Sequence, residues 1–178
     1  MITLPDPVES DLTPLESAQA GGLKRPENRS FHNMVYDSRR GVVVLHGGGN
    51  SSWSVLRDTW EYDGTAWKRV NTVGPVRYVH SMAYDANRGV TVLFGGRNTG
   101  SGDPLSETWE WDGQAWRELD VPLKPKSVIF GDMVFDENRG KIVYFGGMPW
   151  FMVDLSSDTW EYSSSTSHVE QWRQHDPR

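Results

Sequence analysis

An arginine and a histidine three residues apart recur in this sequence and could together hold a ligand. They are Arg29 and His32 in one segment and Arg77 and His80 in another. Side chains of these two types bind anionic or polar groups. The alternative is that they only satisfy polar contacts within the fold, because catalytic sites rarely repeat along a chain. A third related segment lacks both residues, so a site built from them would be asymmetric.

Three variable segments carry a second set of candidates. They read G-N-S-S-W-S-V from Gly49, R-N-T-G-S-G-D-P from Arg97 and M-P-W-F-M-V-D from Met148. The candidate ligand-binding residues in them are Trp53, Arg97, Asn98, Trp150 and Phe151. Loop aromatics favour a binding surface. The alternative is that they cap the edge of a sheet or pack on a second chain.

Acidic residues recur around one strand and could in principle act as acids and bases. They are Asp58, Glu61, Glu107, Glu110, Asp158 and Glu161. Because they recur in every copy, we interpret them as partners of repeated arginines and expect no catalytic residue among them. The five histidines show no metal-ligand spacing, and the chain has no cysteine. No glycine-rich phosphate loop precedes a helix. We therefore expect no metal site and no cofactor.

The elements that position these residues form a threefold internal repeat. Its copies contain M-V-Y-D-S-R-R-G-V-V-V-L-H-G-G, M-A-Y-D-A-N-R-G-V-T-V-L-F-G-G and M-V-F-D-E-N-R-G-K-I-V-Y-F-G-G. Each is followed by a segment with T-W-E-Y or T-W-E-W. The repeat residues we assign to structure are Gly47, Gly48, Gly95, Gly96, Gly146, Gly147, Trp60, Trp67, Trp109, Trp116, Trp160 and Trp172. A period near 50 residues with strand-like content is typical of a propeller blade.

Each copy predicts four strands. We expect the first at 31–36, 79–84 and 131–135, the second at 42–45, 90–94 and 142–145, and the third at 59–62, 108–111 and 159–162. Asp-x-x-Arg-Gly loops join the first two strands, with the arginine predicted to pair with the aspartate. Asp63-Gly64 and Asp112-Gly113 predict two-residue hairpin turns before Trp67 and Trp116. The third copy has 163–167 in place of this turn, and Trp172 is the matching tryptophan.

The pattern resembles the kelch repeat family, in its bacterial form, from residue 29 to about 174. The glycine pair after strand two, the strand-three aromatic and the tryptophan that opens strand four are all present. The resemblance implies an all-β fold of three four-stranded antiparallel blades at about 29–73, 74–124 and 125–178, half of a six-bladed β-propeller. It also implies that the loops after the glycine pairs, with the crossings from strand four to strand one, form the face that commonly binds ligands. Kelch oxidases use a Tyr–Cys cross-link, which a chain without cysteine cannot make.

Three blades cannot close a ring, because propellers typically have four to eight. Two apolar sheet faces would stay uncovered. We favour a twofold homodimer that makes six blades, since closed symmetric assemblies are the most common. A head-to-tail open assembly, a fragment and one chain of a hetero-oligomer are the alternatives.

Composition narrows the remaining classes. The net charge is −6 with mixed signs, which argues against nucleic-acid and membrane-surface binding. No apolar run reaches the length of a membrane helix. Residues 1–28 are broken by proline and glycine, and we expect an extended arm or linker without a signal peptide. We suspect an extracellular or periplasmic location, with a cytoplasmic one as the alternative.

These observations favour a non-enzymatic kelch-type module that assembles with another chain and binds a protein or glycan through its loop face. One alternative is an enzyme at the channel mouth, of the sugar isomerase or lyase type, that uses Arg77, His80 and Arg97. Another is a structural subunit of an extracellular assembly. Fold alone does not choose between them.

Overall fold

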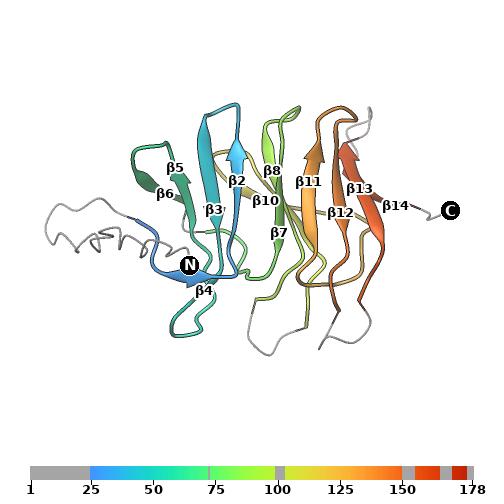
Figure 1. Ribbon diagram of the computed structural model, residues 1–178, viewed down its shortest axis with the longest axis horizontal. Helices are drawn as coiled ribbons and strands as arrows, with labels where there is room; N and C mark the ends of the chain where they lie inside the picture. The colour runs from blue at the N-terminus through green and yellow to red at the C-terminus, as the bar shows by residue number, and fades with distance from the viewer. Residues whose placement is uncertain (1–24, 72, 99–102, 150–154, 165–169, 176–178) are drawn as a thin grey trace, which may run out of the picture.

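The computed structural model describes residues 25–71, 73–98, 103–149, 155–164 and 170–175, and within these ranges the regular structure is β-strand (Figure 1). The strands are β1 (Arg29–Ser30), β2 (Asn33–Asp37), β3 (Val42–His46), β4 (Gly49–Asn50), β5 (Thr59–Tyr62), β6 (Trp67–Asn71), β7 (Ser81–Asp85), β8 (Val90–Phe94), β9 (Thr108–Trp111), β10 (Trp116–Leu119), β11 (Asp132–Asp136), β12 (Lys141–Phe145), β13 (Thr159–Ser164) and β14 (Glu170–His175). Among the residues described, none forms an apolar helix of the length that crossing a bilayer requires.

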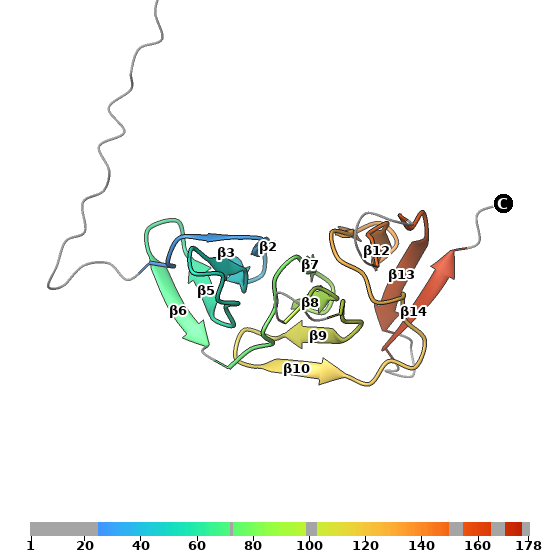
Figure 2. The ribbon, with the colours of Figure 1, turned by 90° about the horizontal axis from the view of Figure 1, so that it is seen from below.

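The strands form three four-stranded antiparallel sheets, as the sequence predicts. Their orders are β2-β3-β5-β6, β7-β8-β9-β10 and β11-β12-β13-β14, so each sheet uses strands that follow one another in the chain apart from the short β4, which pairs with β1. Figure 2 shows the three sheets succeeding one another along an arc, with β6, β10 and β14 on its outer side. We call them the first, second and third blade. The predicted N-terminal arm lies almost entirely outside the described residues.

The first strand of each blade begins one or two residues later than predicted. The cause is the backbone of Phe31, Val79 and Phe130, which have φ angles of 58°, 50° and 58°. A left-handed residue cannot continue an extended strand, and it is uncommon for bulky or β-branched side chains. The chain therefore turns at this position in every repeat before the inner strand starts.

The Asp-x-x-Arg-Gly loops form as predicted. In the first blade, the Asp37 carboxylate accepts hydrogen bonds from the N–H groups of Arg39 and Arg40, and the Arg40 Nε donates to it over 2.6 Å. The same guanidinium also pairs with Glu61 on β5. The arrangement recurs around Arg88 and Arg139. The repeated acidic residues at these positions are thus partners of repeated arginines.

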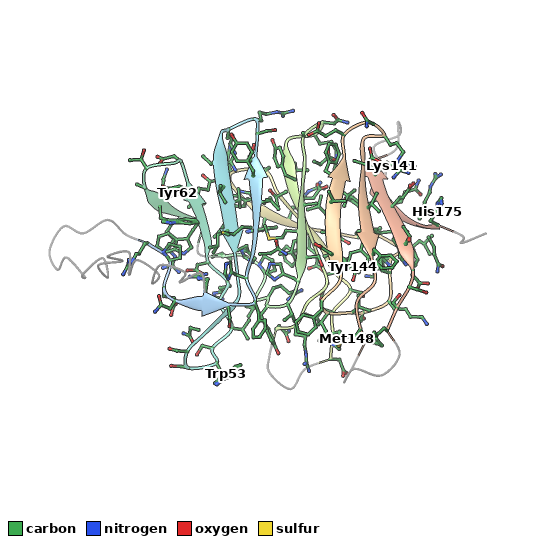
Figure 3. All side chains as sticks on the ribbon, viewed as in Figure 1. Trp53, Tyr62, Lys141, Tyr144, Met148 and His175 are labelled. Carbon is green, nitrogen blue, oxygen red and sulfur yellow. The ribbon has the colours of Figure 1, made fainter. Side chains whose placement is uncertain are left out.

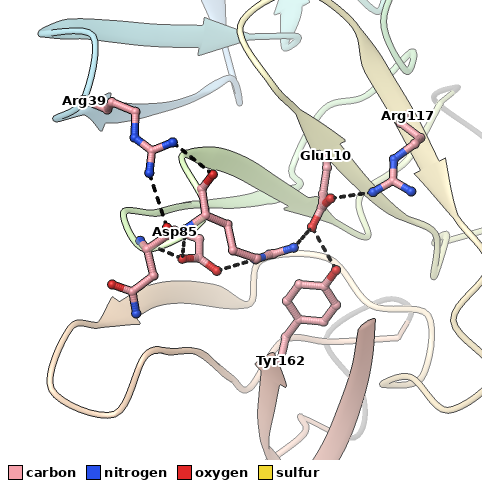
Figure 4. A network of polar contacts seen from close by, with 7 residues as sticks. Arg39, Asp85, Glu110, Arg117 and Tyr162 are labelled. Carbon is pink, nitrogen blue, oxygen red and sulfur yellow. Dashed lines mark hydrogen bonds and ion pairs between the residues drawn. The ribbon is translucent and has the colours of Figure 1, made fainter. Parts of the chain in front are cut away.

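Figure 4 shows this network in the second blade, where it also reaches a neighbour. The Glu110 carboxylate accepts from Arg117 of β10 over 3.0 Å and from the Tyr162 hydroxyl of the third blade over 3.0 Å. The Arg88 guanidinium lies 5.4 Å from the centre of the Tyr162 ring. The loop network therefore contributes to the contact between blades as well as to the hairpin.

The hairpins between the third and fourth strands differ in detail from the prediction. Tyr62 pairs with Trp67, so the connection spans 63–66 and not two residues. The Asp63 carboxylate accepts from the N–H groups of Thr65 and Ala66, and this side-chain cap shapes the longer loop. In the third blade, Trp172 pairs with Tyr162, which confirms it as the counterpart of Trp67.

The apolar core lies between successive blades and not within any one of them. One cluster joins Val44 of the first blade to Met82, Leu93 and Trp111 of the second. A second cluster joins the second and third blades. Its buried members are Ala83, Val92, Phe94, Leu119, Val121, Val128, Met133, Ile142, Tyr144, Trp160, Tyr162 and Trp172. Indole N–H groups cross each junction, from Trp116 to Thr59 Oγ1 over 2.8 Å and from Trp172 to Thr108 Oγ1 over 2.9 Å.

The glycine pairs lie where the backbones of neighbouring segments meet. Gly96 has a φ of 82°, and a Cβ atom there would lie 2.7 Å from the His80 Cβ and 2.8 Å from the Tyr78 carbonyl oxygen. Its N–H donates to the Val128 carbonyl of the next blade over 3.3 Å. The position therefore needs glycine for space as well as for conformation.

We expect Gly96→Val to destabilise the protein by about 2 kcal/mol or more, through clash and backbone strain. Gly64→Val is the matched control, because Gly64 has a φ of 93° but no atom within 4 Å of an added Cβ. Chemical denaturation of both variants separates the two contributions. Equal losses of stability would show that close packing at Gly96 contributes nothing.

Candidate binding face

The described parts of the connections that follow β3, β8 and β12 all lie at one end of the molecule, which we call the loop face (Figure 1). The Asp-x-x-Arg-Gly loops lie at the opposite end. Short ladders that the sequence analysis missed extend each repeat at the loop face. They are the β1–β4 pair and the bridges Tyr78–Arg97 and Ile129–Met148. These ladders hold the crossing segment that enters each blade against the loop that leaves its second strand.

Trp53 is the most exposed aromatic residue of this face among those described. Its side chain is 83% exposed, and Figure 3 shows it at the loop end. The Asn50 side chain accepts from the N–H groups of Ser52 and Ser54, and the Trp53 N–H donates to the Asn50 carbonyl over 2.9 Å. This tight turn holds Trp53 at a φ of 59°. A bulky residue held in the left-handed region is strained, which is typical of functional loops.

Three further aromatic rings surround the base of this loop. Phe31 packs edge-on against Tyr78 at 6.4 Å and against Phe130 at 6.3 Å between ring centres. Both phenylalanines are exposed. Phe31, Trp53 and Tyr78 line a small cavity of about 170 Å³. We call Phe31, Trp53, Tyr78 and Phe130 the aromatic mouth. It offers apolar ring faces beside backbone polar groups, a composition suited to peptide or sugar contacts.

Sequence reasoning included Trp53 in this site but missed the other three rings. Phe31 was assigned to the first strand, where a side chain alternates with its neighbours. The left-handed backbone instead turns it out of the strand. The only signal in the sequence was the recurrence of an apolar residue just before the inner strand, and that recurrence does not reveal exposure.

The predicted site residues Arg29 and Arg77 are buried beneath the aromatic mouth, and each forms an ion pair with a carboxylate. The buried Arg29 guanidinium donates to both Asp58 carboxylate oxygens, over 2.7 and 3.0 Å, and to the Gly47 carbonyl over 3.0 Å. Arg77 is likewise buried and pairs with Glu107. These contacts fix the crossing segment to the loop of the same blade. The geometry matches the alternative in which the repeated arginines satisfy contacts within the fold.

Two of the histidines, His46 and the predicted site residue His80, form a buried pair between the first two blades. His46 and His80 lie 5.8 Å apart between ring centres. His46 Nε2 contacts the Pro75 carbonyl over 2.8 Å, so this nitrogen carries the proton, and Nδ1 accepts from the Thr59 hydroxyl at 3.0 Å. Burial lowers the pKa of His46 to about 4. Burial and the neighbouring His46 and Arg77 charges lower the pKa of His80 well below its ordinary value.

The remaining predicted residues are dispersed. His32 is half-buried, and burial followed by the Arg29 charge lowers its pKa. Arg97 is half-buried and its backbone pairs with Tyr78, whereas Asn98 is exposed. Trp150 and Phe151 lie outside the described residues. Of the predicted set, only Trp53 joins the aromatic mouth.

The fold and the aromatic mouth define a class, an all-β chain of blade-like sheets with an exposed aromatic face. A scan against protein-family models and a search of curated proteins found no match for the chain. Its function is therefore inferred from its own geometry.

Proposed function

We propose that the chain is a non-enzymatic kelch-type module whose three blades complete a β-propeller with another chain and which binds a protein or glycan through the loop face. A glycine pair follows the second strand of every blade, and the fourth-strand tryptophans Trp67, Trp116 and Trp172 pair with equivalent aromatic residues of the third strand. Kelch-type packing of successive blades is consistent with the two inter-blade clusters.

The exposure of the two end faces carries this proposal. Met34 on the free face of the first blade is 49% exposed, whereas its counterpart Met82 is 3% exposed. Phe145 on the free face of the third blade is 56% exposed, whereas its counterpart Phe94 is 1% exposed. The end faces thus present the two complementary halves of a junction that forms twice inside the chain. Apolar faces of this kind favour association with a matching surface.

Backbone groups at the two ends complement each other in the same way. The Val79 N–H donates to the Phe31 carbonyl over 3.0 Å, and the Phe130 N–H donates to the Val79 carbonyl over 3.3 Å. Within the described residues, no following blade supplies the next donor to the Phe130 carbonyl. The Phe31 N–H of another copy would continue the series. A parallel series runs through Gly48 and Gly96, whose N–H groups donate to the next crossing segment.

A second copy is the partner that fits this geometry. Among multiples of three blades, only six falls within the usual range of four to eight. Every sheet is complete within the chain, so joining two copies needs no exchange of strands. The partner's Trp67 would donate to Thr159, as Trp116 and Trp172 donate to Thr59 and Thr108. Its ring would pack on Phe145, as the Trp172 ring packs on Phe94 at 5.1 Å.

One contact of the two internal junctions cannot recur at the closing junction, which is the junction between the third blade of one copy and the first blade of the other. Asn33 Nδ2 donates to the His80 carbonyl over 3.2 Å, and Ser81 Oγ donates to the Gly131 carbonyl over 2.5 Å. Asp132 occupies the equivalent place on the third blade, and a carboxylate does not donate to a carbonyl. We therefore expect the closing junction to be weaker than the internal ones.

We expect light scattering to give a single species of twice the 20.2 kDa chain mass at micromolar concentration. Met34→Lys should disable the first face and Val134→Lys the third, since both side chains are exposed and contribute little to the fold. Either variant alone should be monomeric. Their mixture should form a dimer through the one junction that keeps two intact faces.

Other outcomes of this experiment separate the alternatives. A folded wild-type monomer near 20 kDa would contradict association through the end faces. A broad distribution of large species would indicate an open head-to-tail assembly. If only one of the two variants lost association, the contact would join like faces and the ring would be wrong.

The aromatic mouth supports the binding part of the proposal. The exposed Trp53 ring, on a turn held by hydrogen bonds, provides contact area at little cost in conformational entropy. The enzyme alternative needs Arg77 and His80 to reach a substrate. Arg77 is paired with Glu107, and the side chains of Arg77 and His80 are buried. A role in the fold therefore accounts for these two residues better than catalysis does.

A further inference from the structure

The third blade differs from the first two at three linked positions. Arg29 and Arg77 correspond to Val128, and His32 and His80 correspond to Gly131. Leu45 and Leu93 correspond to Tyr144. Two of these positions, Val128 and Tyr144, line a cavity of about 370 Å³, which we call the Asp158 pocket, and the third, Gly131, lies against the Tyr144 hydroxyl. Its walls include Val128, Tyr144, Gly146, Asp158 and Trp160.

The pocket retains the groups that hold a guanidinium in the first blade. There, Arg29 donates to the two carboxylate oxygens of Asp58 and to the carbonyl of Gly47. The third-blade counterparts of these partners are Asp158 and Gly146, and both line the pocket. The substitution of valine for arginine thus removes the cation and leaves its receptor in place.

Tyr144 fills part of the space that the histidine side chain takes in the other two blades. A Cβ atom at Gly131 would overlap the Tyr144 hydroxyl, so the tyrosine occupies space where the other blades begin a histidine side chain. Burial raises the pKa of Tyr144, which keeps its hydroxyl neutral. Tyr144 and Trp160 both line the pocket. Aromatic faces beside a carboxylate suit a planar cation.

The charge of Asp158 is not balanced by an ion pair in the part of the chain that the structure describes. Asp58 and Glu107, its counterparts, each have an arginine. Lys126 also lines the pocket, and among the described residues it forms no ion pair with Asp158. A partly enclosed carboxylate is stabilised by a hydrogen-bonded cation.

We propose that the Asp158 pocket binds a guanidinium group, supplied by an arginine side chain of a partner protein or by a small guanidine compound. The ligand would repeat the bidentate pairing of Arg29 with Asp58. The guanidinium plane would pack against the aromatic side chains that line the pocket, Tyr144 and Trp160. This site is separate from the aromatic mouth and does not depend on the identity of the ligand bound there.

Calorimetric titration with N-acetyl-arginine amide and with methylguanidine tests the proposal, with N-acetyl-lysine amide as the matched cation. We expect saturable binding of both guanidines and at least about 10-fold weaker binding of the lysine compound, since lysine cannot make the bidentate contact. Stronger binding of the blocked arginine would indicate a protein partner, and stronger binding of methylguanidine would indicate a small ligand.

Two variants make the result specific to the pocket. Asp158→Asn should weaken binding by at least about 10-fold, as expected when a charge-assisted pair is lost. Val128→Arg should abolish binding and raise the melting temperature, because it restores the internal arginine of the other blades. Association of two copies could change access to the pocket, so the titrations should be repeated on the Met34→Lys chain, which we expect to be monomeric. The absence of guanidinium binding in both backgrounds, or binding unaffected by either substitution, would overturn the proposal.

Discussion

Replacement of Trp172 by alanine is expected to lower the free energy of unfolding by about 3–5 kcal/mol. Its side chain is fully buried, and its ring packs on Phe94, Tyr144 and Tyr162 at 5.1, 6.0 and 5.0 Å between centres. The variant would open a cavity in the core between the second and third blades. It would also leave the buried Thr108 hydroxyl without its indole donor. Urea denaturation followed by circular dichroism measures the loss.

Trp53→Ala is the matched control for that measurement. Because this side chain is exposed in a loop, its removal should leave the free energy of unfolding nearly unchanged. It should instead weaken binding of a protein or glycan ligand, by about 1–4 kcal/mol if Trp53 is a hot spot. The strand tryptophans Trp60, Trp109 and Trp160 should behave like Trp172. A loss of stability at Trp53 as large as at the strand positions would make it a packing residue and remove it from the binding face.

Acidification is expected to destabilise the fold between pH 6.5 and about 4. Burial lowers the pKa of His46 from 6.5 to about 4, and it lowers that of His80 as well. As the pH falls through this window, His46 and His80 bind protons in the unfolded chain but stay neutral in the folded chain. Stability is therefore complete above pH 6.5 and declines below it. His46 alone accounts for about 3 kcal/mol at the lower end of the window.

His46→Gln isolates this contribution. The carboxylates titrate in both proteins, so their effect cancels when the pH dependence of unfolding is compared between wild type and variant. The variant should be less stable at pH 7, because the contacts with Thr59 and Pro75 are altered. Its stability should nevertheless fall less steeply with acid. Parallel curves for the two proteins would show that His46 does not resist protonation in the fold.

The repeat made most of the architecture predictable. Runs apolar on both faces, such as 90–94, indicated strands covered on both sides, and the inter-blade clusters confirm this. The Asp-Arg pairs within the hairpin loops followed from residue type and spacing alone. Such features are local or recur identically, so one sequence contains enough information to place them.

The site was harder to predict because it depends on departures from the repeat. The left-handed backbone at Phe31 and Phe130 has no marker comparable to glycine, so the exposure of these rings could not be foreseen. The loss of arginine and histidine from the third copy was visible in the sequence. That Tyr144 moves into the vacated space, and that Asp158 keeps its place, required the three-dimensional arrangement.

The location of the core between blades has a consequence for how such a chain could change over time. Since the buried clusters join only successive blades, the chain could grow or shrink by whole repeats and keep the same kind of junction, although the Phe31–Phe130 contact at the loop face would be rearranged. Duplication of one blade would yield a four-blade chain able to pair into eight. Loss of one would yield a two-blade chain that needs three copies to reach six. In the proposed ring, the number of subunits would follow from the number of repeats in each chain, and no new interface would be needed.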